Sequence, residues 1–167
     1  PVTLLGAVIV VVFGFFFATV SSRMVGLVGS SNNPVSGMAI ATLLIATLIL
    51  KFTGAEGPDG MAAAIAIGSI ICIVSAIAGD TSQDLKTGYL LGSTPRKQQI
   101  AEVIGVVAAA LAIGGTLYLL DSAWGFGTDQ LAAPQATLMK MIIEDVMSAE
   151  LPWGLVILGA LIAVVIE

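Results

Sequence analysis

The sequence is poor in the residues on which most enzymes and metalloproteins rely. It has no histidine, a single cysteine and only 10% charged residues. Without an imidazole, serine–histidine catalysis and metal binding by histidine are excluded. The lone Cys72 cannot form an internal disulfide and belongs to no Cys-x-x-Cys metal pair. We therefore expect no enzymatic activity, no catalytic residue, no metal site and no cofactor.

The scarcity of charge also limits the class of protein and its partners. An average soluble domain has about 25% charged residues, so this chain has too few to cover a surface that faces water. Its six lysine and arginine residues form no strong basic patch, which excludes nucleic acid as an expected partner. The formal net charge of -5 belongs to the segments that connect apolar stretches. The expected surroundings are therefore a lipid bilayer.

Apolar residues are abundant: they make up 57% of the chain and give a mean hydropathy of +1.06. Five uncharged stretches have, or nearly have, the roughly 20 residues that a membrane crossing needs. Helices satisfy their backbone hydrogen bonds internally, so we expect an all-α, polytopic transmembrane helix bundle. The expected spans, in a single transmembrane domain over 1–167, are 2–22, 35–51, 61–79, 95–120 and 152–167. The first is too long for a signal peptide and lacks its positive flank.

Lysine and arginine gather in alternate connections between these spans. Arg23 follows the first span, and Lys86, Arg96 and Lys97 separate the third from the fourth, whereas the second and fourth connections are acidic. Under the positive-inside rule, the connection around Asp80 lies in the cytoplasm. The odd number of spans, with an apolar stretch at the end of the sequence, suggests part of a larger membrane protein.

Residues 79–88 form the most polar cluster and lie between two uncharged apolar stretches. Polar groups are unfavourable near hydrocarbon, so the cluster either handles an ion or a substrate or forms an ordinary solvated connection. We expect Gly79 to end the third span and Asp80 to cap a short cytoplasmic helix, with Gln83 reaching back as in a capping box. Helical spacing predicts one face made of Asp80, Gln83, Asp84 and Thr87.

A second polar cluster, residues 30–37, opens the second span. Asn33 suits the N-cap position and Pro34 the first helical position. The positive end of this helix is a ready site for an anion or a carboxylate, although the segment can also be read as a well-capped helix start and nothing more. With the break expected at Gly79, it would give two interrupted helices, as in secondary transporters.

Residues 134–150 alternate polar and apolar positions at helical spacing. One polar stripe consists of Thr137, Lys140, Glu144 and Ser148. The pattern predicts an amphipathic helix at the outer membrane interface, serving as a connector or, alternatively, as a gate.

These motifs resemble the oligopeptide transporter superfamily, with its oligopeptide and yellow-stripe-like branches. The resemblance lies in Asn32-Asn33-Pro34-Val35-Ser36-Gly37, Gly79-Asp80, Gln83-Asp84-Leu85-Lys86-Thr87-Gly88, Thr94-Pro95-Arg96, Ala133-Pro134-Gln135-Ala136 and Leu151-Pro152-Trp153. The Gln-Asp-x-Lys-Thr-Gly block is the most specific of these segments, and the last two are similar to bacterial members. The resemblance covers most of the chain, from Arg23 to Trp153.

The resemblance implies an all-helical, cation-coupled importer, usually driven by protons, in the bacterial inner membrane. Its substrates would be short peptides or metal chelates of peptide-like ligands. Because family members have a dozen or more spans, the remaining spans of the transporter, or further copies, would complete the transport path.

We expect the two polar clusters to have different roles. The helix start would hold a polar or carboxylate part of the substrate through Asn32, Asn33, Pro34, Ser36 and Gly37. The coupling ion would be handled by Asp80, Gln83, Asp84, Lys86, Thr87 and Glu102. Since histidine is absent, a proton would sit on Asp80, Asp84 or Glu102.

Other classes of protein fit less well. A water channel needs two Asn-Pro-Ala half-helices, and this chain has one related element, Asn33-Pro34-Val35. An intramembrane aspartyl protease needs facing carboxylates from two spans, and Asp80 has no counterpart inside another span. The main alternatives to a transporter are a structural membrane subunit that transports nothing and a channel with an Asn-Pro half-helix.

Overall fold

The computed structural model describes residues 4–55 and 57–166, and its regular secondary structure there is entirely helical. The elements are α1 (Leu4–Val28), the short 3-10 helix η1 (Ser30–Asn32), α2 (Val35–Phe52), α3 (Pro58–Leu91), α4 (Pro95–Trp124), α5 (Pro134–Ser148) and α6 (Trp153–Ile166). The predicted all-α helix bundle is confirmed. Within the described residues, four candidate spans are long and apolar enough to cross a membrane: α1, the segment Ser30–Phe52 that contains α2, α3 and α4.

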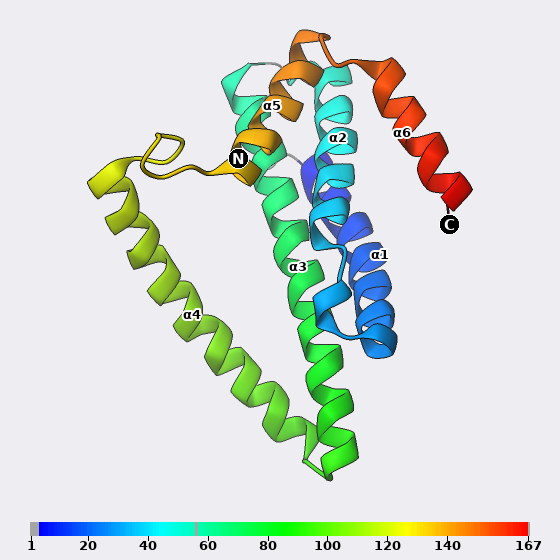
Figure 1. Cartoon of the computed structure of the whole chain (residues 1–167), viewed down its shortest axis with the longest axis vertical. Helices are drawn as coiled ribbons and strands as arrows, with labels where there is room; N and C mark the ends of the chain where they lie inside the picture. The colour runs from blue at the N-terminus through cyan, green and yellow to red at the C-terminus, as the bar shows by residue number, and fades with distance from the viewer. Residues whose placement is uncertain (1–3, 56, 167) are drawn as a thin grey trace.

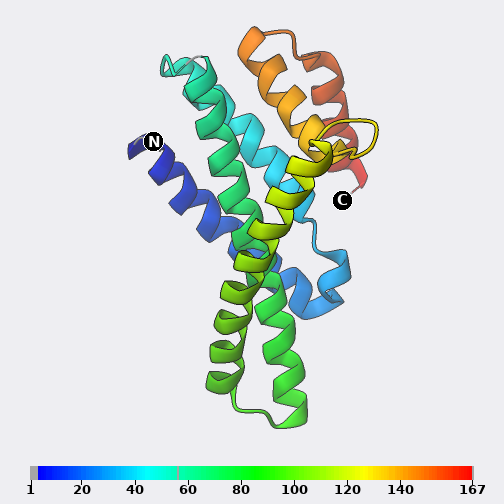
Figure 2. The same ribbon diagram turned by 90° about the vertical axis from the view of Figure 1, so that its left-hand side faces the viewer.

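α3 is the central helix, and α1 and α2 both pack along it (Figure 1). α5 contacts α2 and α3 near the end at which those two helices are connected (Figure 2). The buried core joins α2, α3 and α5 through Leu43, Leu50, Ile67 and Ile143. A Cβ atom on Gly68 would lie 2.5 Å from Cδ2 of Leu43, so the absence of a side chain there allows α2 to approach α3 closely.

α3 is longer than the apolar part of a bilayer is thick. Its 34 residues rise about 51 Å at 1.5 Å per residue, whereas the hydrocarbon core measures about 30 Å. When the apolar part, residues 61–78, crosses the core, the polar end, residues 79–91, extends toward the membrane surface. α3 ends at Leu91, and the residue that caps it, Gly92, has a left-handed φ of 74° that suits glycine.

The predicted break at Gly79 is wrong. α3 continues through Gly79 and Asp80, so Asp80 is not an N-cap and the expected short cytoplasmic helix is the last part of α3. Glycine ends a helix when it adopts a left-handed conformation, but Gly79 remains helical and is buried. A Cβ atom on it would lie 2.9 Å from Oγ of Ser21 on α1, so Gly79 permits close packing.

The predicted cap of α2 is also wrong. Pro34 occupies the N-cap position, α2 begins at Val35, and no side chain caps the helix. The side chain of Asn33 is engaged by α1 and α3 instead, through the hydrogen bonds described below. Tertiary contacts therefore prevail over the local capping preference of asparagine.

α5 has the amphipathic character that its sequence predicts. Ile143 and Val146 are buried, while Lys140 and Glu144 form an exposed ion pair of 3.6 Å on the polar stripe. α6 occupies the range of the predicted fifth span, but it has 14 residues, fewer than the roughly 20 that a crossing needs. A fifth span therefore stays a prediction.

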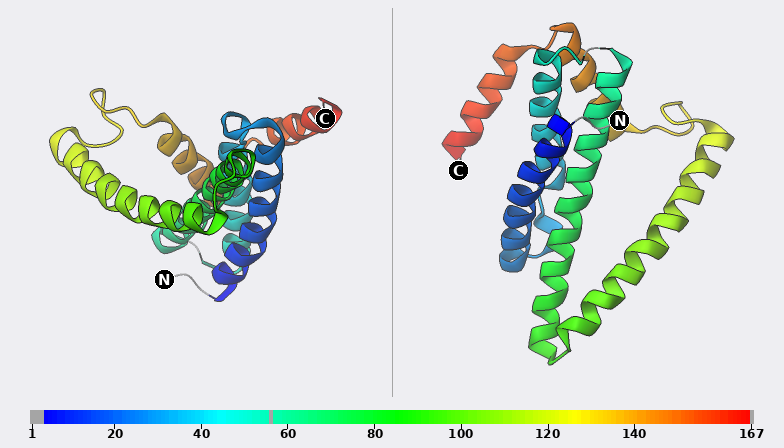
Figure 3. Two further views of the ribbon diagram at one scale, coloured as in Figure 1. Left: turned by 90° about the horizontal axis from the view of Figure 1, so that it is seen from below. Right: turned by 180° about the vertical axis from the view of Figure 1, so that it is seen from behind.

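α4 diverges from the bundle. It meets α3 near the turn at residues 92–94 and then leaves it, so that the two helices form a V, and the connection after α4 returns to α5 (Figures 1 and 3). None of the residues of α4 is buried. Among the elements that the structure describes, α4 contacts α3, in the lower part of the V.

This arrangement predicts that the two ends of α4 lie on opposite sides of the membrane. Single cysteines at Ser93 and Thr128, both exposed, are expected to react with an impermeant thiol reagent from opposite sides in a Cys72→Ser background. Labelling of intact cells and of inverted vesicles measures this. Reaction of both positions from the same side would contradict a membrane-spanning α4.

Candidate functional site

The polar stretch of α3 presents two different surfaces to its neighbours. We call the surface toward α1 and η1 the clasp; its residues are Ser21, Ser22, Gly26, Ser30, Asn33, Ser75, Gly79, Ser82, Gln83 and Lys86. We call the surface toward α4 the carboxylate pocket; its lining residues are Ile77, Asp80, Thr81, Asp84, Glu102, Gly105, Val106 and Ala109.

In the upper part of the clasp, polar groups form a hydrogen-bonded cluster around Gly79. The hydroxyl of Ser21 lies 2.5 Å from the carbonyl oxygen of Ser75 and 3.0 Å from Oδ1 of Asn33. Nδ2 of Asn33 donates to the same Ser75 carbonyl at 3.4 Å. Ser21 and Ser75 are both 0% exposed. Asn33 thus joins the start of α2 to both α1 and α3.

The lower part of the clasp fastens the end of α1 and η1 to α3. Ser82 donates its hydroxyl to the carbonyl oxygen of Ser22 at 2.8 Å. Oε1 of Gln83 accepts from the backbone N–H of Ser30, and Nζ of Lys86 donates to the carbonyl oxygen of Gly26. A cation near the C-terminus of a helix is favourable because the helix dipole is negative there. These side chains therefore fix the position of α1.

The carboxylate pocket lies where α3 and α4 are still close, and has a volume of about 280 Å³. Thr81 donates its hydroxyl to Oε2 of Glu102 at 2.9 Å and so joins the two helices. Nε2 of Gln98 adds a second bond, to the carbonyl oxygen of Asp84 at 3.0 Å. Asp80 and Asp84 are exposed, whereas Glu102 is partly buried.

The carboxylates of the pocket have no cationic partner among the described residues. The ion pair that the structure shows in residues 4–55 and 57–166 is that of Lys140 and Glu144. Lys86, which is close to Asp84 in sequence, bonds to α1 instead. Oε1 of Glu102 is buried and accepts no hydrogen bond from any described residue. Unpaired carboxylates of this kind can attract a cation or exchange a proton.

The residues predicted to bind substrate are split by the structure. Asn33 is used in the clasp, and Nδ2 of Asn32 donates to the carbonyl oxygen of Val28 at 3.4 Å. Pro34, Ser36 and Gly37 are exposed at the start of α2, where no side chain caps the helix.

The residues predicted to handle the coupling ion are split as well. Asp80, Asp84 and Glu102 come together in the pocket, whereas Gln83 and Lys86 lie in the clasp and Thr87 is exposed. Positions i, i+3, i+4 and i+7 span an arc of roughly 100° on a helix with 3.6 residues per turn. This arc crosses the boundary between the side of α3 toward α1 and the side toward α4.

Sequence reasoning missed Thr81, Ser21 and Ser75 as members of these surfaces. Thr81 is one residue from the predicted face, and its signal is that it shares a side of α3 with Asp84, three residues on. Ser75 is an isolated hydroxyl in an apolar stretch, and Ser21 lies in a short polar segment, beside Ser22 and Arg23, at the end of the first expected span. A polar side chain inside a span tends to bond to a neighbouring helix, but the sequence does not say to which one.

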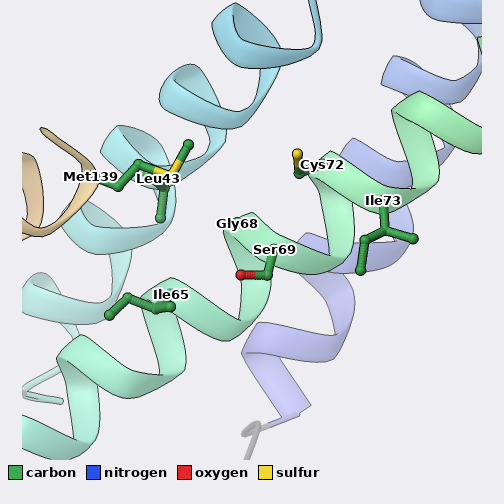
Figure 4. Close-up of a pocket in the computed structure, with 7 residues that line it drawn as sticks. All are labelled: Leu43, Ile65, Gly68, Ser69, Cys72, Ile73 and Met139. Carbon is green, nitrogen blue, oxygen red and sulfur yellow. The ribbon is translucent and has the colours of Figure 1, made fainter. Parts of the chain in front are cut away.

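A separate, apolar cavity of about 210 Å³ lies beside the core (Figure 4). It is lined by Leu43, Ile65, Gly68, Ser69, Cys72, Ile73 and Met139. Its lining offers one hydroxyl and one thiol and no charged group, so it does not suit a peptide with its charged termini.

Comparison with known proteins gives a consistent result. The family model described as OPT oligopeptide transporter protein matches residues 1–167. A Haemophilus influenzae protein named as an oligopeptide transporter is 37% identical over 168 residues, which are 89% of this chain and 26% of that protein. A Saccharomyces cerevisiae protein with the same designation is 30% identical, over 76% of this chain and 17% of its own length. An Oryza sativa subsp. japonica protein named as a metal-nicotianamine transporter is 32% identical, over 72% and 17% respectively. The chain thus spans about a quarter or less of these relatives, and no solved structure matches it.

The close contact at Gly79 predicts that Gly79→Ala destabilises the protein. The added methyl group would meet Asn33, Ser21 and Val25, and overpacking costs about 1–3 kcal/mol. Gly114→Ala is the matched control, because nothing lies within 4 Å of a Cβ there and alanine favours a helix by about 1 kcal/mol. We expect thermal unfolding in detergent at a lower temperature for Gly79→Ala and at an equal or higher one for Gly114→Ala. Equal unfolding temperatures for Gly79→Ala and Gly114→Ala would contradict the close packing at Gly79.

Proposed function

Since the chain belongs to the OPT oligopeptide transporter family, we propose that it is part of a secondary active transporter in which proton movement drives the uptake of short peptides or peptide-like metal chelates. Members of this family are transporters and not enzymes. The observation that carries the proposal is the carboxylate pocket, in which Asp80, Asp84 and Glu102 lie between two candidate membrane spans without a cationic partner among the described residues.

The proton site of this transporter is the carboxylate pocket. Asp80 and Asp84 are exposed, so a proton or hydrated cation reaches them from water, and Glu102 lies deeper, on the other helix. Asp80 and Asp84 on α3 and Glu102 on α4 place proton acceptors on both helices of the V. A conformation that binds the proton better is favoured by protonation, as any state is favoured by the ligand it binds better.

The substrate site lies at the start of α2. Ser36 and Gly37 are exposed in a first turn that no side chain caps, and the free N–H groups of such a turn favour a carboxylate. Asn32 lies just before this turn, and Asn33 with Pro34 fixes its position. The peptide carboxylate, or the carboxylate of a metal chelate, is the chemical group that this end of α2 would hold.

The clasp connects these two sites. Asn33 packs against Gly79 and accepts from Ser21, and Gly79 directly precedes Asp80 on α3. A shift of α2 on substrate binding would therefore displace α3 next to the pocket. Gln83 and Lys86 hold η1 and α1 against α3 and do not contact the ion.

The bacterial inner membrane is the proposed location, in keeping with the Haemophilus influenzae relative. The apolar spans make the chain an integral membrane protein. Further spans of the same transporter would complete the path, because the chain matches 26% of that relative's length.

The proposal predicts that Asp80→Asn, Asp84→Asn or Glu102→Gln abolishes uphill uptake by the full-length transporter. We expect concentrative uptake to fall by about tenfold or more, as for the loss of a typical coupling free energy, while substrate exchange without a proton gradient survives in at least one variant. Uptake into liposomes with and without an imposed pH gradient measures both.

Glu144→Gln is the control for this experiment. It removes a carboxylate from an exposed ion pair outside the pocket, and such pairs contribute about 1 kcal/mol or less. Its uptake should match that of the unmodified protein. Normal accumulation in all three pocket variants would place the coupling site elsewhere and favour a structural role for this segment.

A further inference from the structure

The first turn of α4 carries two cations that neither the clasp nor the carboxylate pocket uses. Arg96, the last residue of the motif Thr94-Pro95-Arg96, and the adjacent Lys97 are both exposed. The ion pair that the structure shows in its described ranges is that of Lys140 and Glu144, so no described carboxylate pairs with either cation of α4. Two unpaired cations at the end of a candidate membrane span provide a positive charge that an anion can neutralise.

An apolar groove of about 430 Å³ continues from the first of these cations along α4. We call it the basic groove, and all of its lining residues belong to α4: Arg96, Gln99, Ile100, Val103 and Ile104. It lies on the side of α4 away from α3. Ile100 is two residues from both Gln98 and Glu102, which bond to α3, and two residues turn a helix by about 200°. Because α3 is the element that contacts α4 within the described residues, the basic groove is open (Figure 3).

Large aliphatic side chains extend the groove further along the same side of α4. Val107 and Leu111 follow Val103 and Ile104 at helical spacing and are 56% and 76% exposed. From Ile100 to Leu111 this aliphatic strip rises about 17 Å, close to the roughly 15 Å of hydrocarbon in one membrane leaflet. Gly114, the next residue on this side, interrupts the strip. Its length therefore matches that of a lipid acyl chain in one leaflet.

We propose that the basic groove and the aliphatic strip bind one anionic phospholipid. The guanidinium of Arg96 presents a planar fork that pairs with two oxygens of a phosphate. The side-chain amide of Gln99, one turn further, adds an N–H donor for the headgroup, and the acyl chain lies along the strip from Ile100 to Leu111. The groove thus offers a charged end and an apolar length in the order in which a phospholipid has them.

The charges around the groove favour an anionic headgroup over a zwitterionic one. Lys97 lies beside Arg96 and would repel the ammonium group of phosphatidylethanolamine. The carboxylates that could attract that ammonium, Asp80, Asp84 and Glu102, line the pocket on the other side of α4. Basic residues next to a membrane span also attract anionic lipids in general. Phosphatidylglycerol has the phosphate without the ammonium and is the simplest lipid that meets these conditions.

Photolabelling of the full-length transporter in liposomes tests this proposal. The probe is a phosphatidylglycerol with a diazirine in one acyl chain. Trypsin cleaves after Lys97 and next after Lys140, so a single peptide carries the aliphatic strip, and tandem mass spectrometry locates the label within it. Unlabelled phosphatidylglycerol, phosphatidylethanolamine and inorganic phosphate are each added as competitors.

Arg96→Gln removes the cation of the groove, and Arg96→Lys keeps the charge but not the planar fork. Arg23→Gln is the matched control, because Arg23 is an exposed cation of α1 that does not line the groove. If the Arg96 variants do not fold, the competition experiment on the unmodified protein decides the question.

We expect label between Ile100 and Leu111 that phosphatidylglycerol displaces at a lower concentration than phosphatidylethanolamine does. Arg96→Gln should weaken the binding about tenfold, Arg96→Lys less, and Arg23→Gln should leave it unchanged. Equal displacement by the two phospholipids, or an equal loss in Arg23→Gln, would overturn the proposal by showing general attraction to the membrane. So would displacement by inorganic phosphate, which indicates a simple anion site, or a strip without label, which indicates that protein covers it. The measurement involves neither the transported substrate nor the proton, so its result is independent of the proposed function.

Discussion

The close approach of α1 to α3 at Gly79 is the contact on which the positions of α1 and of the start of α2 depend. Ser21, Asn33 and Ser75 meet there with little exposure to solvent. Hydrocarbon gives helices no hydrophobic reason to associate, so close packing and hydrogen bonds must hold them together. The hydrogen-bonded cluster at Gly79 provides close packing and hydrogen bonds, and through Asn33 it also fixes where α2 begins.

The same stretch of α3 performs a second task on its other side. Asp80, Thr81 and Asp84 alternate along the chain with Ser82, Gln83 and Lys86, yet the two sets point to different helices. Because α3 stays helical through this polar stretch, the rigid contact to α1 and the weakly packed contact to α4 share one backbone.

Much of the fold could be predicted from the sequence, because it depends on features that are local. Apolar stretches of sufficient length predict α1 to α4, and the spacing of Thr137, Lys140 and Glu144 predicts α5. The family resemblance rested on short motifs and agrees with the family model. What failed depends on contacts between distant segments. The sequence around Gly79 is the same whether the glycine ends a helix or allows close packing inside one. The side chain of Asn33 does not cap α2, because it accepts a hydrogen bond from Ser21, 12 residues away. No local feature of the sequence predicts that α4 diverges from α3.

The central claim is that neighbouring residues of α3 have separate roles on its two faces, and Gln83 and Asp84 test it most directly because they are adjacent. The measurement compares Gln83→Leu with Asp84→Asn in the full-length transporter, recording for each the thermal unfolding temperature and the ratio of proton-driven uptake to exchange. Gln83→Leu leaves the Ser30 N–H without its acceptor, so this account predicts a lower unfolding temperature with an unchanged ratio. Asp84→Asn should leave the unfolding temperature unchanged and lower the ratio of proton-driven uptake to exchange. The opposite assignment, with Asp84→Asn unstable and Gln83→Leu uncoupled, would contradict it.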